Sequence, residues 1–166
     1  IRIPQYPLYS AAGSLLNLAA LTYRLDAQQH WEPSLTDIKA KIDEARSQGI
    51  EPRVIVVINP GNPTGACMTR AEVEDMIKLA HRESLAIFAD EVYQDNVYNK
   101  DRPFVPFRRV LMELQNSQDA SEREIGSSVE LVSFHSTSKG MVGECGRRGG
   151  FFVLNNMDAE VEAQIN

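Results

Sequence analysis

Cysteine and histidine are scarce in this 166-residue sequence. Its two cysteines, Cys67 and Cys145, stand far apart, and its three histidines show no spacing typical of metal ligands. A disulfide framework and a zinc site are therefore not expected, and Cys145 is expected to be a packed residue. Two isolated thiols are typical of a reduced, intracellular protein, either cytoplasmic or mitochondrial.

The sequence also lacks an excess of positive charge and a long apolar stretch. It carries 17 Lys and Arg against 23 Asp and Glu, a formal net charge of −6, which argues against nonspecific nucleic-acid binding. No apolar run is long enough to cross a membrane, and residues 1–7 lack the layout of a signal peptide. The chain starts abruptly, so its true start is expected to lie upstream. Its 43% apolar residues suit one globular domain with a real core.

Short apolar runs alternate with amphipathic helices, a rhythm typical of α/β proteins with a largely parallel sheet. Strands are predicted at residues 20–25, 53–58, 85–89, 129–134 and 149–154. Helices are predicted after Ser34, after Thr69, where Glu72 completes a capping box, and from Phe107. The polar segment 115–128 is predicted to be an exposed connection. Because ligands collect at the carboxyl edge of such sheets, polar residues that follow the strands are expected to converge there.

The most informative segment, Ser133-Phe-His-Ser-Thr-Ser-Lys-Gly140, continues directly from a predicted strand. It places Lys139 among hydroxyl groups, and a glycine-rich stretch ending in Arg147 and Arg148 follows it. A lysine amine that loses its proton can hold a carbonyl compound covalently, while hydroxyls and a guanidinium bind phosphate. This combination suits a phosphorylated aldehyde such as pyridoxal phosphate. A surface lysine in a mobile glycine loop is the alternative.

Two more polar segments follow predicted strands. Asn59-Pro-Gly-Asn-Pro-Thr-Gly65 combines prolines, which fix φ, with glycines, so it could hold the Asn62 amide in place. Pro63 is a candidate for a cis peptide bond. Asp90 closes a buried strand and needs a cationic partner, such as a protonated pyridine nitrogen, while Tyr93 could reach a ring hydroxyl. The alternatives are a plain strand-to-helix turn for the loop, and a helix cap or an arginine ion pair for Asp90.

Taken in order, these segments resemble those of fold-type I pyridoxal-phosphate-dependent aminotransferases. The resemblance rests on Asn59–Gly65, Asp90-Glu-Val-Tyr93 and Ser136-Thr-Ser-Lys139, while Ile3–Ser10 and Gly143–Gly150 look like the alanine-specific members. It implies a three-layer α/β/α fold with a mostly parallel sheet. It also implies transfer of the amino group of L-alanine to 2-oxoglutarate, giving pyruvate and L-glutamate. A carbon–sulfur lyase, an aminocyclopropane-carboxylate synthase and a non-catalytic truncated or regulatory product are the alternatives.

The resemblance also implies a role for each residue of the site. Lys139 would hold pyridoxal 5'-phosphate covalently and move a proton, and Asp90 would pair with the pyridine nitrogen. Asn62 and Tyr93 would bind the phenolic oxygen. The remaining contacts would be ring stacking by Tyr6 and phosphate binding by Ser136, Ser138 and an arginine. Arg148 is preferred to Arg147 there, because its flanking residues match the alanine type.

Members of this family are far longer than this chain. Residues 1–166 would form the central part of the large, cofactor-binding domain. The preceding phosphate-binding segment and the C-terminal domain, with its arginine for the substrate carboxylate, would be absent. The complete relatives are homodimers whose sites combine residues of both subunits. We therefore expect the chain by itself to have little or no transaminase activity.

Overall fold

A four-stranded sheet forms the centre of the computed structural model, which describes residues 1–165. Its strand order is β4 (Val54–Ile58), β5 (Ala86–Asp90), β6 (Leu131–Ser136) and β7 (Gly150–Asn155). β4, β5 and β6 are parallel, and β7 runs antiparallel to β6. A second, small sheet consists of β1 (Arg2–Ile3), β2 (Tyr23–Asp26) and β3 (Glu32–Pro33). The mostly parallel sheet predicted from the sequence is confirmed.

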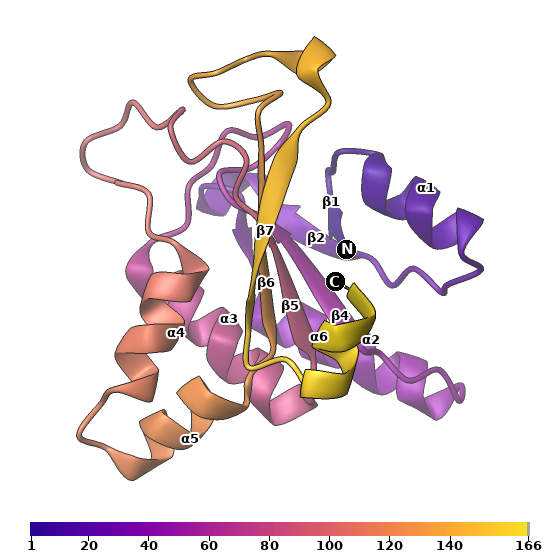
Figure 1. Ribbon diagram of the computed structural model, residues 1–166. Helices are drawn as coiled ribbons and strands as arrows, with labels where there is room; N and C mark the ends of the chain where they lie inside the picture. Colours follow the sequence, from indigo (N-terminus) through magenta and orange to yellow (C-terminus); the bar gives the residue numbers. More distant parts are fainter. Residues whose placement is uncertain (166) are drawn as a thin grey trace.

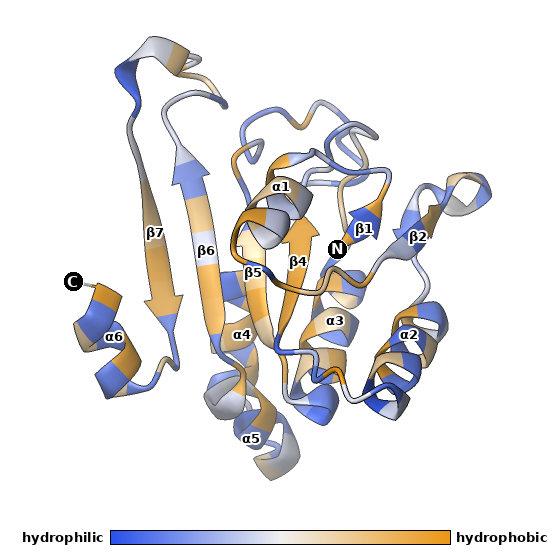
Figure 2. Ribbon diagram, turned by 90° about the vertical axis from the view of Figure 1, so that its right-hand side faces the viewer, coloured by the Kyte–Doolittle hydropathy of each residue, from blue (hydrophilic) through white to orange (hydrophobic). Residues whose placement is uncertain are grey.

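Helices lie on both faces of the larger sheet, which gives the three layers. α3 (Arg70–Glu83), α4 (Phe107–Gln115) and α5 (Ala120–Ser128) gather on one side. α1 (Leu8–Leu15) and α6 (Ala159–Ile165) lie on the other (Figure 1). α2 (Leu35–Ser47) lies beyond β4, at the opposite side of the sheet from β7 (Figure 2). Among residues 1–165, no helix is long and apolar enough to cross a membrane.

The predicted helix starts carry the expected caps. The Ser34 hydroxyl accepts a hydrogen bond from the backbone N–H of Asp37 at the start of α2. Thr69 and Glu72 form both halves of the capping box at the start of α3. The apolar stripe of α3 is fully buried and packs with α4 and the sheet into one core. Its largest fully buried side chains include Phe107, Met76, Ile77 and Ile87.

The prediction of an exposed connection at residues 115–128 is wrong, because this segment contains α5. The carboxylate of Asp119 caps the helix by accepting from the backbone N–H groups of Ser121 and Glu122. Ile125 packs against the core, and Gly126 lies against the end of α4. A single apolar contact and a glycine leave no periodic stripe in the sequence, so the helix was missed.

The close contact at Gly126 gives a first prediction. A Cβ added there would lie 2.7 Å from the Cα of Gln115 and 2.8 Å from the carbonyl carbon of Leu114, both backbone atoms. Gly126→Ala is therefore expected to lower the free energy of unfolding by about 2 kcal/mol, despite alanine's higher helix propensity. Urea unfolding measures this change.

Gly13, in α1, is the matched control for this substitution. Its nearest neighbour to an added Cβ is the Leu18 carbonyl oxygen at 3.9 Å. Gly13→Ala is expected to leave stability unchanged or to raise it by up to about 1 kcal/mol. Equal effects of the two substitutions would contradict the contact between α5 and α4.

Candidate active site

The parallel strands bring three polar segments to the carboxyl edge of the larger sheet. Asn59 directly follows β4, Asp90 ends β5 and Ser136 ends β6. The backbone N–H of Asn59 donates to the carbonyl oxygen of Asp90 at 2.9 Å. The fully buried Asn59 side chain accepts from the backbone N–H of Met68 at 2.9 Å and so fixes the loop that follows. This edge is where ligands bind in open α/β sheets.

Asp90 is buried, with 8% of its surface exposed. Its Oδ2 accepts a hydrogen bond of 2.6 Å from the hydroxyl of Tyr9, and Oδ1 accepts one of 3.4 Å from the backbone N–H of Val92. Burial raises the pKa of Tyr9, and the charge and hydrogen bond of Asp90 raise it further, so this phenol stays a donor. Tyr9 holds the carboxylate in place and leaves its charge unneutralised.

Asn62, Tyr93 and Lys139 meet at the same edge. The Nδ2 of Asn62 donates to the Tyr93 hydroxyl at 3.5 Å, and the Nζ of Lys139 lies 5.9 Å from the centre of the Tyr93 ring. All three side chains are half-buried, and the Asn62–Pro63 bond is cis, as the sequence suggested. Three segments far apart in sequence thus place an amide, a phenol and an amine together.

A second cluster of polar groups surrounds Ser138. The Ser136 hydroxyl accepts from the backbone N–H of Ser138 at 3.0 Å. Nη1 of Arg148 lies 3.5 Å from the Ser138 hydroxyl and donates to the carbonyl oxygen of Cys145 at 2.7 Å. Arg148 therefore adjoins the hydroxyls that follow β6. Cys145 is exposed, contrary to the prediction of a packed thiol, because it lies in a short surface turn.

Tyr6 lies in the segment between β1 and α1, with 43% of its surface exposed. Tyr9, three residues later, contacts Asp90, so this segment passes close to the carboxylate. The stacking role of Tyr6 stays a prediction. Sequence reasoning gave Tyr9 no role, because its contact with Asp90 joins residues 81 positions apart and no local pattern marks it.

Glu91 is also buried, and its role is structural. Its Oε1 accepts from the backbone N–H of Phe107 at 2.8 Å, at the start of α4. Burial raises the pKa of Glu91 to about 7 from its ordinary value of 4.5. A carboxyl with a raised pKa in the folded state favours folding when protonated. Its contribution is complete below about pH 4.5 and is lost as the pH rises through about 7.

Glu91→Gln is expected to remove this pH dependence, because an amide keeps the acceptor for Phe107 without a charge. Wild-type stability should fall by about 3 kcal/mol between pH 5 and pH 8 relative to that of the variant. Urea unfolding of both proteins at the two pH values measures the difference. Parallel stability curves for the two proteins would show that the Glu91 carboxyl is not buried as described.

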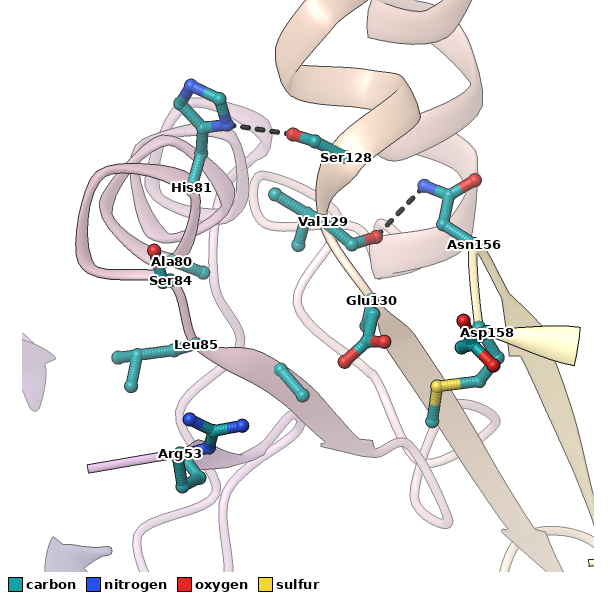
Figure 3. Close-up of a pocket in the computed structure, with 12 residues that line it drawn as sticks. Arg53, Ala80, His81, Ser84, Leu85, Ser128, Val129, Glu130, Asn156 and Asp158 are labelled. Atoms are coloured by element: carbon teal, nitrogen blue, oxygen red, sulfur yellow. Dashed lines mark hydrogen bonds between the residues drawn. The ribbon is translucent and has the colours of Figure 1, made fainter. Parts of the chain in front are cut away.

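A separate cavity lies at the amino edge of the parallel strands, away from Asp90 and Lys139. It encloses about 530 Å³. His81 and Ser128 pair across one wall at 2.8 Å, and Asn156 donates to the carbonyl oxygen of Val129 at 2.9 Å (Figure 3). Asn156 thereby ties the end of β7 to the segment that precedes β6. These contacts join elements of the fold, and the cavity takes no part in the site at the carboxyl edge.

Comparisons with known proteins agree with this arrangement. Residues 1–166 match the family of class I and II aminotransferases. Glutamate–glyoxylate aminotransferase 1 of Arabidopsis thaliana is 42% identical over 165 residues, 99% of this chain and 33% of that protein. Alanine aminotransferase 1 of Rattus norvegicus is 46% identical over 165 residues, 99% of this chain and 32% of that protein. The chain spans about a third of the length of these relatives.

Solved structures have the same fold. An aminotransferase from Escherichia coli is 30% identical, with a TM-score of 0.78 over 99% of this chain and 35% of that one. A pyridoxal-phosphate-bound C–S lyase from Staphylococcus hominis, 15% identical, has a TM-score of 0.75 over 99% of this chain and 37% of that one. The resemblance found in the sequence is confirmed: this chain belongs to the class I and II aminotransferase family.

Proposed function

We propose that this chain is the cofactor-binding part of a pyridoxal-phosphate-dependent enzyme that transfers the amino group of L-alanine to 2-oxoglutarate. The observation that carries this proposal is the meeting of Asn62, Tyr93 and Lys139 at the sheet edge that also holds the buried Asp90. The choice of alanine is supported by relatives of 46% identity that are named alanine aminotransferases.

The donor groups present match the chemistry of pyridoxal phosphate. That molecule carries an aldehyde, a phenolic oxygen, a pyridine nitrogen and a phosphate. Lys139 offers an amine for the aldehyde, Asn62 and Tyr93 offer donors for the phenolic oxygen, and Asp90 offers a carboxylate for the nitrogen. Ser136, Ser138 and Arg148 offer hydroxyls and a guanidinium for the phosphate.

The residues have distinct tasks in this proposal. When bound, the cofactor supplies a sink for the electron pair left on the substrate α-carbon once its proton is removed. The Nζ of Lys139 takes that proton and later returns one, as a general base and acid. Asp90 keeps a proton on the pyridine nitrogen through its negative charge. Tyr9 fixes the orientation of the Asp90 carboxylate through the 2.6 Å hydrogen bond. Asn62 and Tyr93 orient the ring by hydrogen bonding.

Residues outside this chain complete the enzyme in this proposal. The chain spans about a third of these relatives, and because its motifs resemble those of the family's large domain, we infer that it is the central part of that domain. The group that binds the substrate carboxylate and the second subunit of a homodimer lie beyond it. The 166-residue chain alone is expected to transaminate at no more than the background rate, because no group in it holds the substrate beside the reacting groups. An assay of alanine-dependent glutamate formation, beside the full-length protein, tests this.

A second candidate function is transfer from glutamate to glyoxylate. It is favoured by the 42% identity to a glutamate–glyoxylate aminotransferase. In the reverse direction, the alanine reaction transfers the amino group of L-glutamate to pyruvate. Glyoxylate and pyruvate are both short 2-oxo acids, so the two functions share one site and differ in this acceptor. Comparing kcat/KM of the full-length protein for pyruvate and glyoxylate, with L-glutamate as donor, separates them. A higher value for pyruvate supports the alanine assignment, and release of a thiol from a cysteine conjugate without transamination would overturn both.

A further inference from the structure

Arg2 is a buried cation that the proposed function does not yet use. It lies in β1 with 7% of its surface exposed. Its Nη2 donates to the backbone carbonyl oxygen of Asn62 at 3.3 Å, across 60 residues of sequence. Its Nε has no hydrogen-bond partner within residues 1–165. Burial lowers the pKa of Arg2, which shows that its charge is held there at a cost.

The guanidinium also packs directly against the loop that carries Asn62. A Cβ added at Gly61 would lie 2.9 Å from Nη2 and 3.1 Å from Nη1 of Arg2. The Thr64 hydroxyl lies closer still to that position, so Gly61 is packed between Thr64 and the guanidinium. Arg2 thus contacts two consecutive residues of the segment that presents the Asn62 amide.

Of the titratable groups that act on Arg2, only Asp90 carries a negative charge, and it belongs to the carboxylate side of the site. The guanidinium interacts with the titratable side chains of Tyr23, in β2, of Asp90, at the end of β5, and of Tyr9, in α1. Tyr9 in turn donates to Asp90. Arg2 therefore contacts the loop that presents the Asn62 amide, and its charge acts on the carboxylate that ends β5.

We propose that Arg2 is a positioning residue for the cofactor site: its hydrogen bond holds the Asn62 loop in place, and its buried positive charge acts on Asp90. This inference rests on the proposed function. A purely structural role is less economical, because burying a charge costs free energy that an apolar side chain of similar size would not cost. The positive charge of Arg2 weakens the attraction between the Asp90 carboxylate and a protonated group of the bound cofactor.

The test uses the full-length protein that contains this chain, with Arg2→Met and Arg2→Lys. Methionine keeps an unbranched stem like that of arginine and removes the charged guanidinium, whereas lysine keeps the charge and loses the planar fork. Three properties are measured: thermal unfolding without cofactor, the Kd for pyridoxal phosphate, and the pH at which the absorption of the bound cofactor changes.

Arg2→Met is expected to weaken pyridoxal phosphate binding about tenfold, because the Asn62 loop loses the hydrogen bond to the Asn62 carbonyl oxygen. It should also raise the pH of the absorption change by about one unit, because loss of a nearby positive charge stabilises a cation at the site. Arg2→Lys should weaken binding similarly, because the shorter lysine side chain does not reach the Asn62 carbonyl oxygen, but it should keep the wild-type pH of the absorption change. These results would support the proposal.

Other results overturn it in distinguishable ways. A wild-type Kd and a wild-type absorption change in Arg2→Met, with only a lower unfolding temperature, would make Arg2 merely structural. If Arg2→Met does not fold, Arg2→Lys decides, and wild-type binding in that variant would overturn the proposal. Failure of the wild-type protein itself to bind pyridoxal phosphate would instead overturn the proposed function, and this inference with it.

Discussion

Lys139→Ala is expected to lower the turnover of the full-length aminotransferase by about 10⁴-fold or more. In the proposed function, the substitution removes both the covalent attachment of the cofactor and the amine that moves the substrate proton. The lysine side chain is half-buried and lies over the Tyr93 ring, so its loss should change the free energy of unfolding by only about 0.5 kcal/mol. Steady-state kinetics and urea unfolding of the same preparation measure the two effects.

Lys100→Ala is the matched control. Lys100 is an exposed lysine in the segment between β5 and α4, outside the proposed site. Turnover of that variant should equal that of the wild-type protein. Turnover within tenfold of wild type in Lys139→Ala, at saturating cofactor, would contradict the role of this residue.

Asp90→Asn is expected to reduce kcat by roughly 10³-fold, because in the proposed function the carboxylate holds a proton on the pyridine nitrogen and a neutral amide would not. The amide oxygen can still accept the hydrogen bond from Tyr9, so the position of the side chain should be kept. The loss should therefore appear in kcat more than in the amount of cofactor bound. Stopped-flow measurement of the first half-reaction with L-alanine isolates this effect from substrate release.

Asp101→Asn serves as the control for the removed charge. Asp101 is exposed in a turn, where its backbone N–H donates to the side chain of Asn99, outside the proposed site. It should behave as the wild-type protein does. A half-reaction rate for Asp90→Asn close to that of Asp101→Asn would show that the carboxylate is not paired with the cofactor ring.

The parts of the fold that could be predicted from the sequence are those with a local cause. The continuous apolar run at residues 53–58 became β4, because a strand covered on both faces needs no alternation. Thr69 and Glu72 marked the start of α3, because a capping box is complete within four residues. Both signals arise from side chains that act on their own backbone.

Three helices had no such signal. α5 has a single apolar contact, through Ile125, and α1 and α6 have no buried residue among residues 1–165. An amphipathic stripe cannot appear where a helix buries no face. β1 was missed for a different reason: it has only two residues, and its pairing with β2 depends on contacts across about 20 positions.

The site divides in the same way. The convergence of Asn62, Tyr93 and Lys139 could be predicted because each follows a strand, and parallel strands bring their carboxyl ends to one edge. Tyr9 and Arg2 could not, because their partners, Asp90 and Asn62, lie 81 and 60 positions away. Their contacts depend on how the small sheet and α1 pack beside β4 and β5.

The central claim is that the amine of Lys139 bonds the cofactor at the edge of the sheet where Asp90 lies. Borohydride reduction of the full-length protein with pyridoxal phosphate, followed by peptide mapping by mass spectrometry, tests it most directly. The account predicts one reduced adduct, on the peptide that contains Lys139, and none on that peptide in Lys139→Ala. An adduct on a different lysine of the wild-type protein, with the Lys139 peptide unmodified, would contradict it.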